Sequence, residues 1–272
     1  MSARTIGGAL ALGLAALSLA ACVFGYRGEA EVSATYPLAG VDAIRIDLGA
    51  SPLIVTGDPM APGLEIAGVW QSVGGNAKTA RDNATTPDLV WSQDGAFAEL
   101  RAYVPLALRG QVDFEADEIR VPPDLDLELV TALGDVQIVG IDGNLSVDAH
   151  VGRVEIDGGA GGIAVATGDG DLDIRSVGHI DAHTRHGSAR IVQEGMGGND
   201  VVVSARGDID VVLRADANLD LRLRGREIRV ATRTVSTVRG GSFDRTVGSG
   251  NVKVWLDAGP GNVRVELVEQ TE

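Results

Sequence analysis

All four histidines of the chain, His150, His179, His183 and His186, lie in one repetitive stretch. Imidazole is the commonest protein ligand for metals such as zinc, so the first chemistry to consider is a zinc site. In a strand, however, His179 and His183 would lie about 13 Å apart, too far to share an ion with Zn–N bonds of about 2 Å. His183 and His186 can approach each other across a turn, but a third ligand is not evident. The pattern favours solvated turn histidines, and we predict no metal site.

The segment "TGDGDLDIR" (167–175) carries Asp169, Asp171 and Asp173, and alternate carboxylates after glycine suggest calcium. An EF-hand is excluded because the sixth and twelfth positions counted from Asp169 are Ile174 and Ile180. Calcium-binding β-rolls repeat a Gly-Gly-x-Gly element, which does not recur here. An Asp that follows Gly more simply bonds nearby backbone amides of its turn. We therefore predict no cofactor, and calcium dependence is left open.

A catalytic site would need acids and cations on one outer face, and Asp173, Asp181, Arg175 and Arg190 are the candidates. Right-handed β-helices include polysaccharide lyases and hydrolases built in this way. Those enzymes usually carry long loops beside the site, whereas residues 134–215 leave little room for loops. No Gly-x-Ser-x-Gly nucleophile elbow occurs either. We predict that the protein is not an enzyme, and a carbohydrate-active β-helix enzyme is the alternative.

The segment "DLRLRGREIRVATR" (220–233) gathers arginines in an acidic chain: Arg222, Arg224, Arg226, Arg229 and Arg233. Strand alternation would send Arg222 and Arg224 to one face. Such a strip could bind an anionic glycan or a lipid head group. The other role is to neutralise acidic neighbours such as Asp208, Asp210 and Asp216. The pattern favours this second role, so the arginines are the weaker binding candidates.

Glycines mark the elements that would position these residues. Gly134, Gly143, Gly152, Gly161 and Gly170 follow one another at nine-residue steps, and later glycines continue with slips of a residue or two. Two and four places after each of these glycines stands an aliphatic pair. This alternation predicts strands with one buried face, and glycine permits the tight corners between them. A fixed period of this kind is typical of a solenoid.

The coil of such a solenoid should contain about 18 residues. Nine residues cannot enclose a core, because one strand of about five residues and a turn leave no second wall. One wall would contain the columns Val136, Val154, Leu172, Ala189 and Ile138, Ile156, Ile174, Ile191. The other would contain Leu145, Ile163, Ile180 and Val147, Val165, Ala182. Parallel crossovers are right-handed, so we predict an all-β fold, a right-handed parallel β-helix.

The β-solenoid domain is expected to span 36–272. Residues 58–117 depart from the period and should form an irregular insertion, which is also a candidate contact region together with the flat outer sheet faces. Open solenoid ends need covers. Residues 36–110 would cap one end, and Trp255 would cover the last coil at the other.

Two stretches resemble a known family: "IRVPPDLDLELVTALGDVQIVGIDGNLSVDAHVGRVEIDG" (119–158) and "GGSFDRTVGSGNVKVWLDAGPGNVRVEL" (240–267). A short Val-Pro strand, Gly-Asp-Val-x-Val repeats and a closing Gly-Ser-Gly-Asn-Val segment resemble the bacterial putative-adhesin family of repetitive β-solenoid proteins. The resemblance covers roughly 41–57 and 118–267. It implies an envelope-associated, non-enzymatic β-helix, and it brings no functional residues with it.

The first 22 residues, "MSARTIGGALALGLAALSLAAC", have a cation, an apolar run and small residues, which is the pattern of a secretory signal. Their end, Leu19-Ala20-Ala21-Cys22, resembles the lipobox of bacterial lipoproteins. The resemblance implies a signal peptide over 1–21, lipidation of Cys22, and a lipidated N-terminus and linker over 22–35. Val23 follows where an inner-membrane retention signal would place Asp, which indicates an outer-membrane address. An ordinary signal peptide with an incidental cysteine is the alternative.

The net charge of the chain limits the classes of partner that it can bind. The formal net charge is -15, and removal of 1–21 takes away Arg4, which leaves 22 cations against 38 acids, or -16. Such a surface repels phosphate backbones, so we predict no nucleic-acid partner. We expect a lipid-anchored, non-catalytic, adhesin-like binding or scaffolding module of the bacterial cell envelope. Its partners would be the membrane, through the lipid, and an envelope protein or glycan. A self-associating structural envelope protein is a further alternative.

Overall fold

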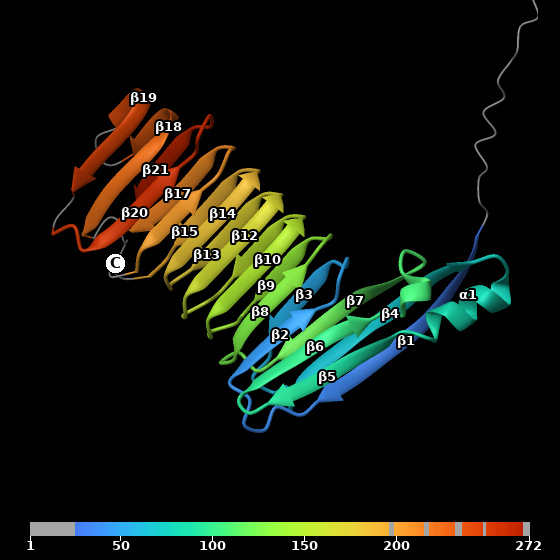
Figure 1. Ribbon diagram of the computed structural model, residues 1–272. Helices are drawn as coiled ribbons and strands as arrows, with labels where there is room; N and C mark the ends of the chain where they lie inside the picture. Colours follow the sequence, from blue (N-terminus) through green and yellow to red (C-terminus); the bar gives the residue numbers. More distant parts are fainter. Residues whose placement is uncertain (1–24, 196–198, 215–217, 232–235, 247–248, 269–272) are drawn as a thin grey trace, which may run out of the picture.

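The computed structural model describes residues 25–195, 199–214, 218–231, 236–246 and 249–268. Cys22 and the expected signal peptide lie outside the described residues. Within them the chain is all-β, with 21 strands, one α-helix, α1 (Ala77–Ala84), and one 3-10 helix, η1 (Leu106–Leu108). The strands form an elongated body in which successive coils lie side by side (Figure 1).

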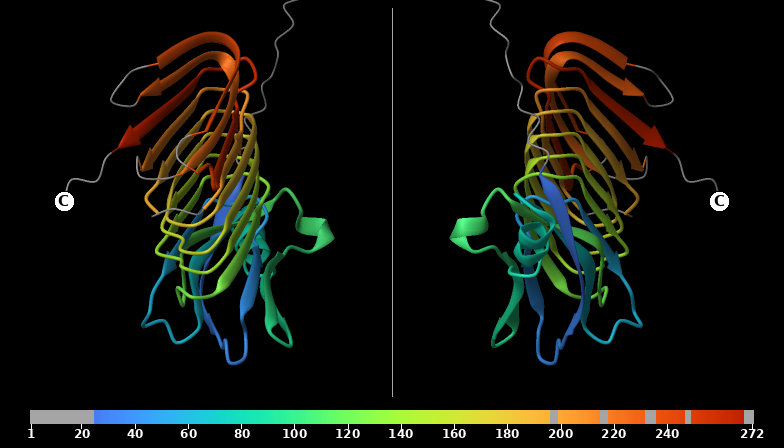
Figure 2. Two further views of the ribbon diagram at one scale, coloured as in Figure 1. Left: turned by 90° about the vertical axis from the view of Figure 1, so that its left-hand side faces the viewer. Right: turned by 90° about the vertical axis from the view of Figure 1, so that its right-hand side faces the viewer.

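The central body consists of two stacks of parallel strands. Stack A contains β8 (Asp126–Thr131), β10 (Leu145–Val151), β12 (Ile163–Asp169), β14 (Ile180–His186) and β16 (Val201–Ser204). Stack B contains β9 (Val136–Val139), β11 (Val154–Asp157), β13 (Leu172–Ser176), β15 (Ala189–Gln193) and β17 (Ile209–Arg214). The chain alternates between the stacks, so that each coil contributes one strand to each. Figure 2 shows these coils as nested, flattened loops.

The register confirms the columns expected from the 18-residue repeat. Ile138, Ile156 and Ile174 lie directly opposite one another in stack B, and each is 1% exposed or less. In stack A, Leu145 pairs with Ile163 in the same way. The core therefore runs between the stacks as continuous aliphatic columns, and burial of these side chains is the main stabilising contribution.

Glycine holds the corners because the coils approach each other there through their backbones. Gly134 and Gly152 have φ of 125° and 142°, a region that favours glycine. A Cβ on Gly152 would lie well inside van der Waals contact with the carbonyl oxygen of Gly134. The polar residue after some of these glycines joins one coil to the next: Asp135 accepts a hydrogen bond from the amide of Arg153 at 2.8 Å. The amide belongs to the neighbouring coil rather than to the same turn.

The N-terminal end corrects two expectations. Residues 26–35, expected in a linker, belong to β1 (Tyr26–Tyr36), which pairs along its full length with β4 (Leu64–Gly74). Residues 58–117 are not irregular, because they contain β4, β5 (Asp88–Asp94), β6 (Phe97–Tyr103) and most of β7 (Val112–Val121). The glycine period disappears there because β1, β4 and β7, and likewise β5 and β6, pair antiparallel.

The first coil of the chain lies between this antiparallel end and the body. It consists of β2 (Ala43–Asp47) and β3 (Leu53–Gly57). In stack A, β2 pairs with β6 on one side and β8 on the other. In stack B, β3 pairs with β7 and β9. The segment 58–121 therefore covers the end of the two stacks before the chain returns to continue the body.

The C-terminal end is closed by a hairpin of β18 (Leu219–Ala231) and β19 (Ser236–Thr246). The last coil, β20 (Val252–Asp257) and β21 (Val263–Val268), inserts between the body and this hairpin. The expectation that Trp255 covers the last coil is wrong. Trp255 points outward from β20 and is 38% exposed, because its neighbours Val254 and Leu256 occupy the core.

Candidate functional site

The candidate site is a groove on the outer face of stack A, with a volume of about 470 Å³. It crosses β6, β2, β8, β10, β12 and β14, and this volume is in the range of small-molecule sites. It is lined by Ala43, Ile44, Phe97, Asp126, Leu127, Glu128, Asn144, Leu145, Ser146, Gly162, Ile163, Ala164, His179 and Asp181. The groove runs across the strands, so a ligand in it would lie along the long axis of the molecule.

Small side chains on β12 make the groove hollow. Because Ile163 and Val165 point into the core, Gly162 and Ala164 form the outer surface of this strand. Ala164 lies directly opposite Ser146 on β10 and Asp181 on β14. Longer side chains on the neighbouring strands therefore stand on either side of a low strip.

Polar groups border the groove, and several are already bound to one another. Arg45 donates to Glu128 at 2.6 Å and lies 3.7 Å from Glu99. Asn144 donates to Asp126 at 3.0 Å. Ser146, His179 and Asp181 are different, because within the described residues their side chains have no hydrogen-bond or ion-pair partner. A ligand could engage these three side chains without breaking an existing contact.

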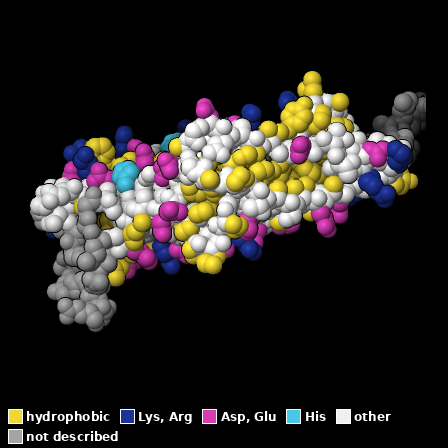
Figure 3. All heavy atoms as spheres, turned by 90° about the horizontal axis from the view of Figure 1, so that it is seen from below, with side chains coloured by type: hydrophobic (Ala, Val, Ile, Leu, Met, Phe, Trp, Pro, Cys, Tyr) yellow, Lys and Arg dark blue, Asp and Glu magenta, His cyan; other side chains and the backbone are white. Residues whose placement is uncertain are grey.

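Phe97 adds an aromatic ring at the N-terminal end of the groove, where it is 41% exposed. Its position opposite Ala43 places it in the first outward row of stack A. On the face seen in Figure 3, hydrophobic side chains gather along the middle of the molecule and charged side chains stand on either side. An apolar floor with a few polar groups at its border is the usual composition of a binding site.

The histidines do not converge on a metal site. His179 immediately precedes β14, His183 lies on the outer face of β14, and His150 lies on β10. His186 lies 2.6 Å from Asp169 through Nδ1, and its Nε2 lies 3.4 Å from Arg206. No group of three or more His, Cys, Asp or Glu that could hold a metal ion is found among the described residues.

The three aspartates of the candidate calcium segment have separate contacts. Asp169 binds His186, as described above. Asp171 accepts a hydrogen bond from the amide of Ser188 in the next coil at 2.7 Å. Asp173 binds the guanidinium of Arg153 at 3.0 Å. Each carboxylate thus has its own protein partner, and the three do not gather around a common point.

The residues of the catalytic alternative are split between the two stacks. Asp173 lies on β13 in stack B, whereas Asp181 lies on β14 in stack A. Asp173 has Arg190 directly opposite and Arg153 bound to it. The two carboxylates therefore lie on the outer faces of different stacks and do not form an acid pair.

The arginine segment is likewise divided, because β18 turns a corner at Gly225. Arg222 and Arg224 point outward from the part of β18 that continues stack A through β20, as alternation predicted. Arg226 and Arg229 lie beyond the corner, where β18 pairs with β21. The interpretation as one strip over 222–233 is therefore wrong, and Arg233 lies outside the described residues.

Acidic neighbours hold most of these arginines. Arg222 lies 3.4 Å from Asp220, Arg224 lies 3.9 Å from Asp257, and Arg229 lies 3.3 Å from Glu227. Arg222 also stacks on the ring of Trp255 at 4.8 Å. These contacts agree with a neutralising role, but the partners are not the expected Asp208 and Asp210, and Asp216 lies outside the described residues.

The groove itself was missed in the sequence, although a signal was present. The aliphatic residues after each glycine identify the inward positions, so the residues between them must form the outer face. On β12 these outward residues are Ala164, Ala166 and Gly168, preceded by Gly162, and this run has the smallest side chains in stack A. Their register against β10 and β14 follows from the repeat length.

The comparisons with known proteins give little. No family model matches the chain, and no curated protein matches it. Among solved structures, the chain is similar to one from Clostridium sporogenes that is described as a "putative cell adhesion protein". The two are 13% identical, the match covers 89% of this chain and 100% of the other, and the TM-score is 0.37. This likeness is too weak to assign a function.

No helix in the described part of the chain is long and apolar enough to cross a bilayer. The predicted lipidation site, Cys22, lies three residues before Gly25, where the described chain begins.

Proposed function

We propose that this protein is a lipid-anchored, non-catalytic binding module of the bacterial cell envelope, and that it holds an extended partner in the groove of stack A. The observation that carries the proposal is the low strip of β12 between polar borders on β10 and β14. Repeated flat faces suit extended partners, because each coil presents the same spacing to the ligand.

The architecture that we propose is a right-handed parallel β-solenoid with about 18 residues per coil. The parallel registers between strands one coil apart support it, as in the pairs Leu145–Ile163 and Val154–Leu172. The right hand follows from the general rule for parallel crossovers. The motifs in 119–158 and 240–267 are the support for membership in the adhesin family.

The anchor and address are also proposals. The lipobox-like sequence before Cys22 supports lipidation, and Val23 supports the outer membrane. Two or three acyl chains would hold the protein firmly, whereas one chain alone binds a membrane only marginally.

The partner that fits the groove best is a glycan strand built from N-acetylated sugars. The acetamido methyl group suits the apolar floor at Ala164, and its N–H can donate to the carboxylate of Asp181. Phe97 offers a ring for the apolar face of a terminal sugar. The acidic border disfavours an anionic polymer, so the sugars should carry no net negative charge.

A titration of the purified protein with chitohexaose, the hexamer of N-acetylglucosamine, tests this proposal. We expect saturable binding by calorimetry without release of shorter oligosaccharides. Ala164→Trp should abolish the binding, because the bulky ring fills the groove from an outward position. Gln137→Trp, on the outer face of stack B, is the matched control and should bind as the natural chain does.

Failure would take two forms. Equal binding by the Ala164→Trp and natural proteins would exclude the groove as the site. Progressive shortening of chitohexaose would instead identify an enzyme, and the non-catalytic part of the proposal would be abandoned.

A further inference from the structure

Several elements meet at the N-terminal end of the molecule and form a surface that we call the N-terminal rim (Figure 1). It consists of the start of β1, the end of β4, α1, the start of β5, the end of β6, η1 and the start of β7. The antiparallel registers bring these strand ends together: Tyr26 pairs with Gly74, Ser72 with Val112, and Asp88 with Tyr103. The rim includes the end of the molecule at which the described chain begins, at Gly25.

The rim exposes large apolar side chains. Tyr26 is 55% exposed, Val73 45%, Tyr103 56% and Leu106 79%. Each stands at a strand end or in η1, so packing against the core does not require it. Tyrosine and leucine in such positions are typical of surfaces that lie at a membrane interface, where the ring or chain enters the head-group region.

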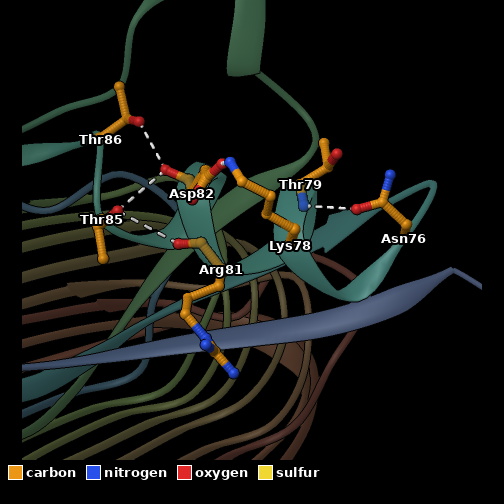
Figure 4. A network of polar contacts seen from close by, with 7 residues as sticks. All are labelled: Asn76, Lys78, Thr79, Arg81, Asp82, Thr85 and Thr86. Carbon is orange, nitrogen blue, oxygen red and sulfur yellow. Dashed lines mark hydrogen bonds and ion pairs between the residues drawn. The ribbon is translucent and has the colours of Figure 1, made fainter.

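The rim also carries unpaired arginines, which lie among the acids Glu29, Asp82, Asp88 and Asp113 of the same elements. Arg27, Arg81 and Arg109 have no carboxylate partner among the described residues, in contrast to the paired arginines of β18. On α1, Lys78 binds Asp82 at 2.6 Å, while the side chain of Arg81 points away from that pair (Figure 4). Unpaired guanidinium groups are well suited to phosphate, which they can bind with two hydrogen bonds.

The short distance in sequence between Cys22 and Gly25 determines which surface the rim would contact. If Cys22 carries the acyl chains, only residues 22–24 separate the bilayer from the folded chain at Gly25. Three extended residues span at most about 10 Å. The rim is therefore held within reach of the lipid head groups, without a linker that could move the solenoid away.

We propose that the N-terminal rim docks on the surface of the bilayer that holds the lipid anchor. Tyr26, Val73 and Leu106 enter the interfacial region, and Arg27 and Arg109 bind lipid phosphates. The inference rests on the proposed lipidation of Cys22. It adds an orientation, in which the end with α1 and η1 lies against the membrane and the body with its groove extends from it.

The test uses the mature chain, coupled through the Cys22 thiol to a maleimide lipid in vesicles of phosphatidylcholine and phosphatidylglycerol. This tether makes the measurement independent of natural lipidation. A fluorophore is attached through an azide-bearing amino acid in place of Leu106 or, as a control, of Ser242 on β19 at the opposite end of the solenoid. Quenching by lipids with a nitroxide in the head group reports contact with the bilayer.

We expect quenching at position 106 to exceed that at position 242 by at least about fivefold, because only the rim should reach the interface. The double variant Arg27→Glu and Arg109→Glu should lose at least about half of this quenching, since its charges repel phosphatidylglycerol. Arg185→Glu, on the outer face of stack A and also without a carboxylate partner, is the matched control and should change nothing.

Equal quenching at 106 and 242, or quenching that the double variant retains in full, would overturn the docking proposal. A protein partner at the rim would give the first of these results. The anchor itself is tested separately, by the mass of the Cys22 peptide from a membrane fraction. Failure of the anchor and failure of the docking surface are therefore distinguishable.

Discussion

The body of stacked parallel strands and the two ends of the molecule are built in different ways. In the body, strands that pair are about one coil apart in sequence, as with Leu145 and Ile163. At the ends, partners are far apart: Ala43 pairs with Asp126, and Val201 with Val254. The body consists of repeated coils. At each end, a segment of the chain leaves the two stacks and covers their open end, and the chain then returns to the stacks.

The two ends share this device although their sequences differ. At the N-terminus the coil of β2 and β3 lies between the body and the antiparallel segment 58–121. At the C-terminus the coil of β20 and β21 lies between the body and the hairpin of β18 and β19. A parallel stack with an open end would expose its hydrogen-bonding edge and core, and antiparallel strands close both.

The largest effect should come from removal of the β18–β19 hairpin, which covers the C-terminal end. Replacing residues 219–246 by a short Gly/Ser linker exposes the edges of β20 and β21 and the core that Leu221, Leu223 and Ile228 cover. We expect end-to-end self-association in sedimentation velocity, because exposed strand edges pair with other chains. A truncated chain that sediments and melts like the full chain would show that the hairpin is not a cover.

The second-largest effect should come from substitution of a corner glycine in the body. Gly152→Ala places a methyl group against the carbonyl oxygen of Gly134 at a φ of 142°. We expect the free energy of unfolding to fall by at least about 2 kcal/mol, measured by urea denaturation. Gly75→Ala is the control at the N-terminal end, since a Cβ there meets nothing within 4 Å. It should stay within about 0.5 kcal/mol of the natural chain, and equal losses would contradict the backbone stacking.

The aspartates that join coils should have a smaller effect. Asp135→Ala removes the acceptor for the amide of Arg153 and should lower the free energy of unfolding by about 1–2 kcal/mol. Asp148→Ala, on the outer face of β10, has no such contact among the described residues and should change it by less than about 0.5 kcal/mol. Equal denaturation midpoints for the two variants would show that the aspartate ladder does not stabilise the body.

The smallest effect concerns the N-terminal end. Burial, with Asp88 nearby, raises the pKa of Tyr36 above its usual value of about 10, and its ring stacks on Trp91 at 5.0 Å. The folded state thus favours the neutral phenol. The contribution of Tyr36 to the free energy of unfolding is therefore complete below about pH 10, and it is lost as the pH rises through the raised pKa of the folded state. Phenolate absorbance should place the Tyr36 titration lower in Trp91→Ala, and an unchanged titration would contradict burial as the cause.

The body could be predicted from sequence because each position in its repeat corresponds to a fixed place in the coil. A glycine, then aliphatic residues two and four places later, identify corner and core, and the columns through Ile156 and Ile163 follow from the period. The outward residues of the groove, such as Ala164, are fixed by the same alternation. They could have been found by reading the positions between the aliphatic ones.

The ends could not be predicted in this way. The alternation in β1 is that of a half-buried edge strand, so its small and polar residues look like a linker. No local pattern shows that 252–268 inserts before the hairpin. The outward position of Trp255 could have been found, because it alternates with the buried Val254 and Leu256. The division of the arginines did have a signal, because Gly225 pairs with Gly241 where the hairpin turns its corner.

Methyl NMR tests the 18-residue stacking most directly. In a chain with labelled isoleucine methyl groups, Ile156 should show nuclear Overhauser effects to both Ile138 and Ile174, because adjacent strands lie about 4.8 Å apart. Ile138 and Ile174, about 9.6 Å apart, should show none to each other. If Ile156 gave no cross-peak to either neighbour, the stacked coils would be refuted, and with them the groove that they form.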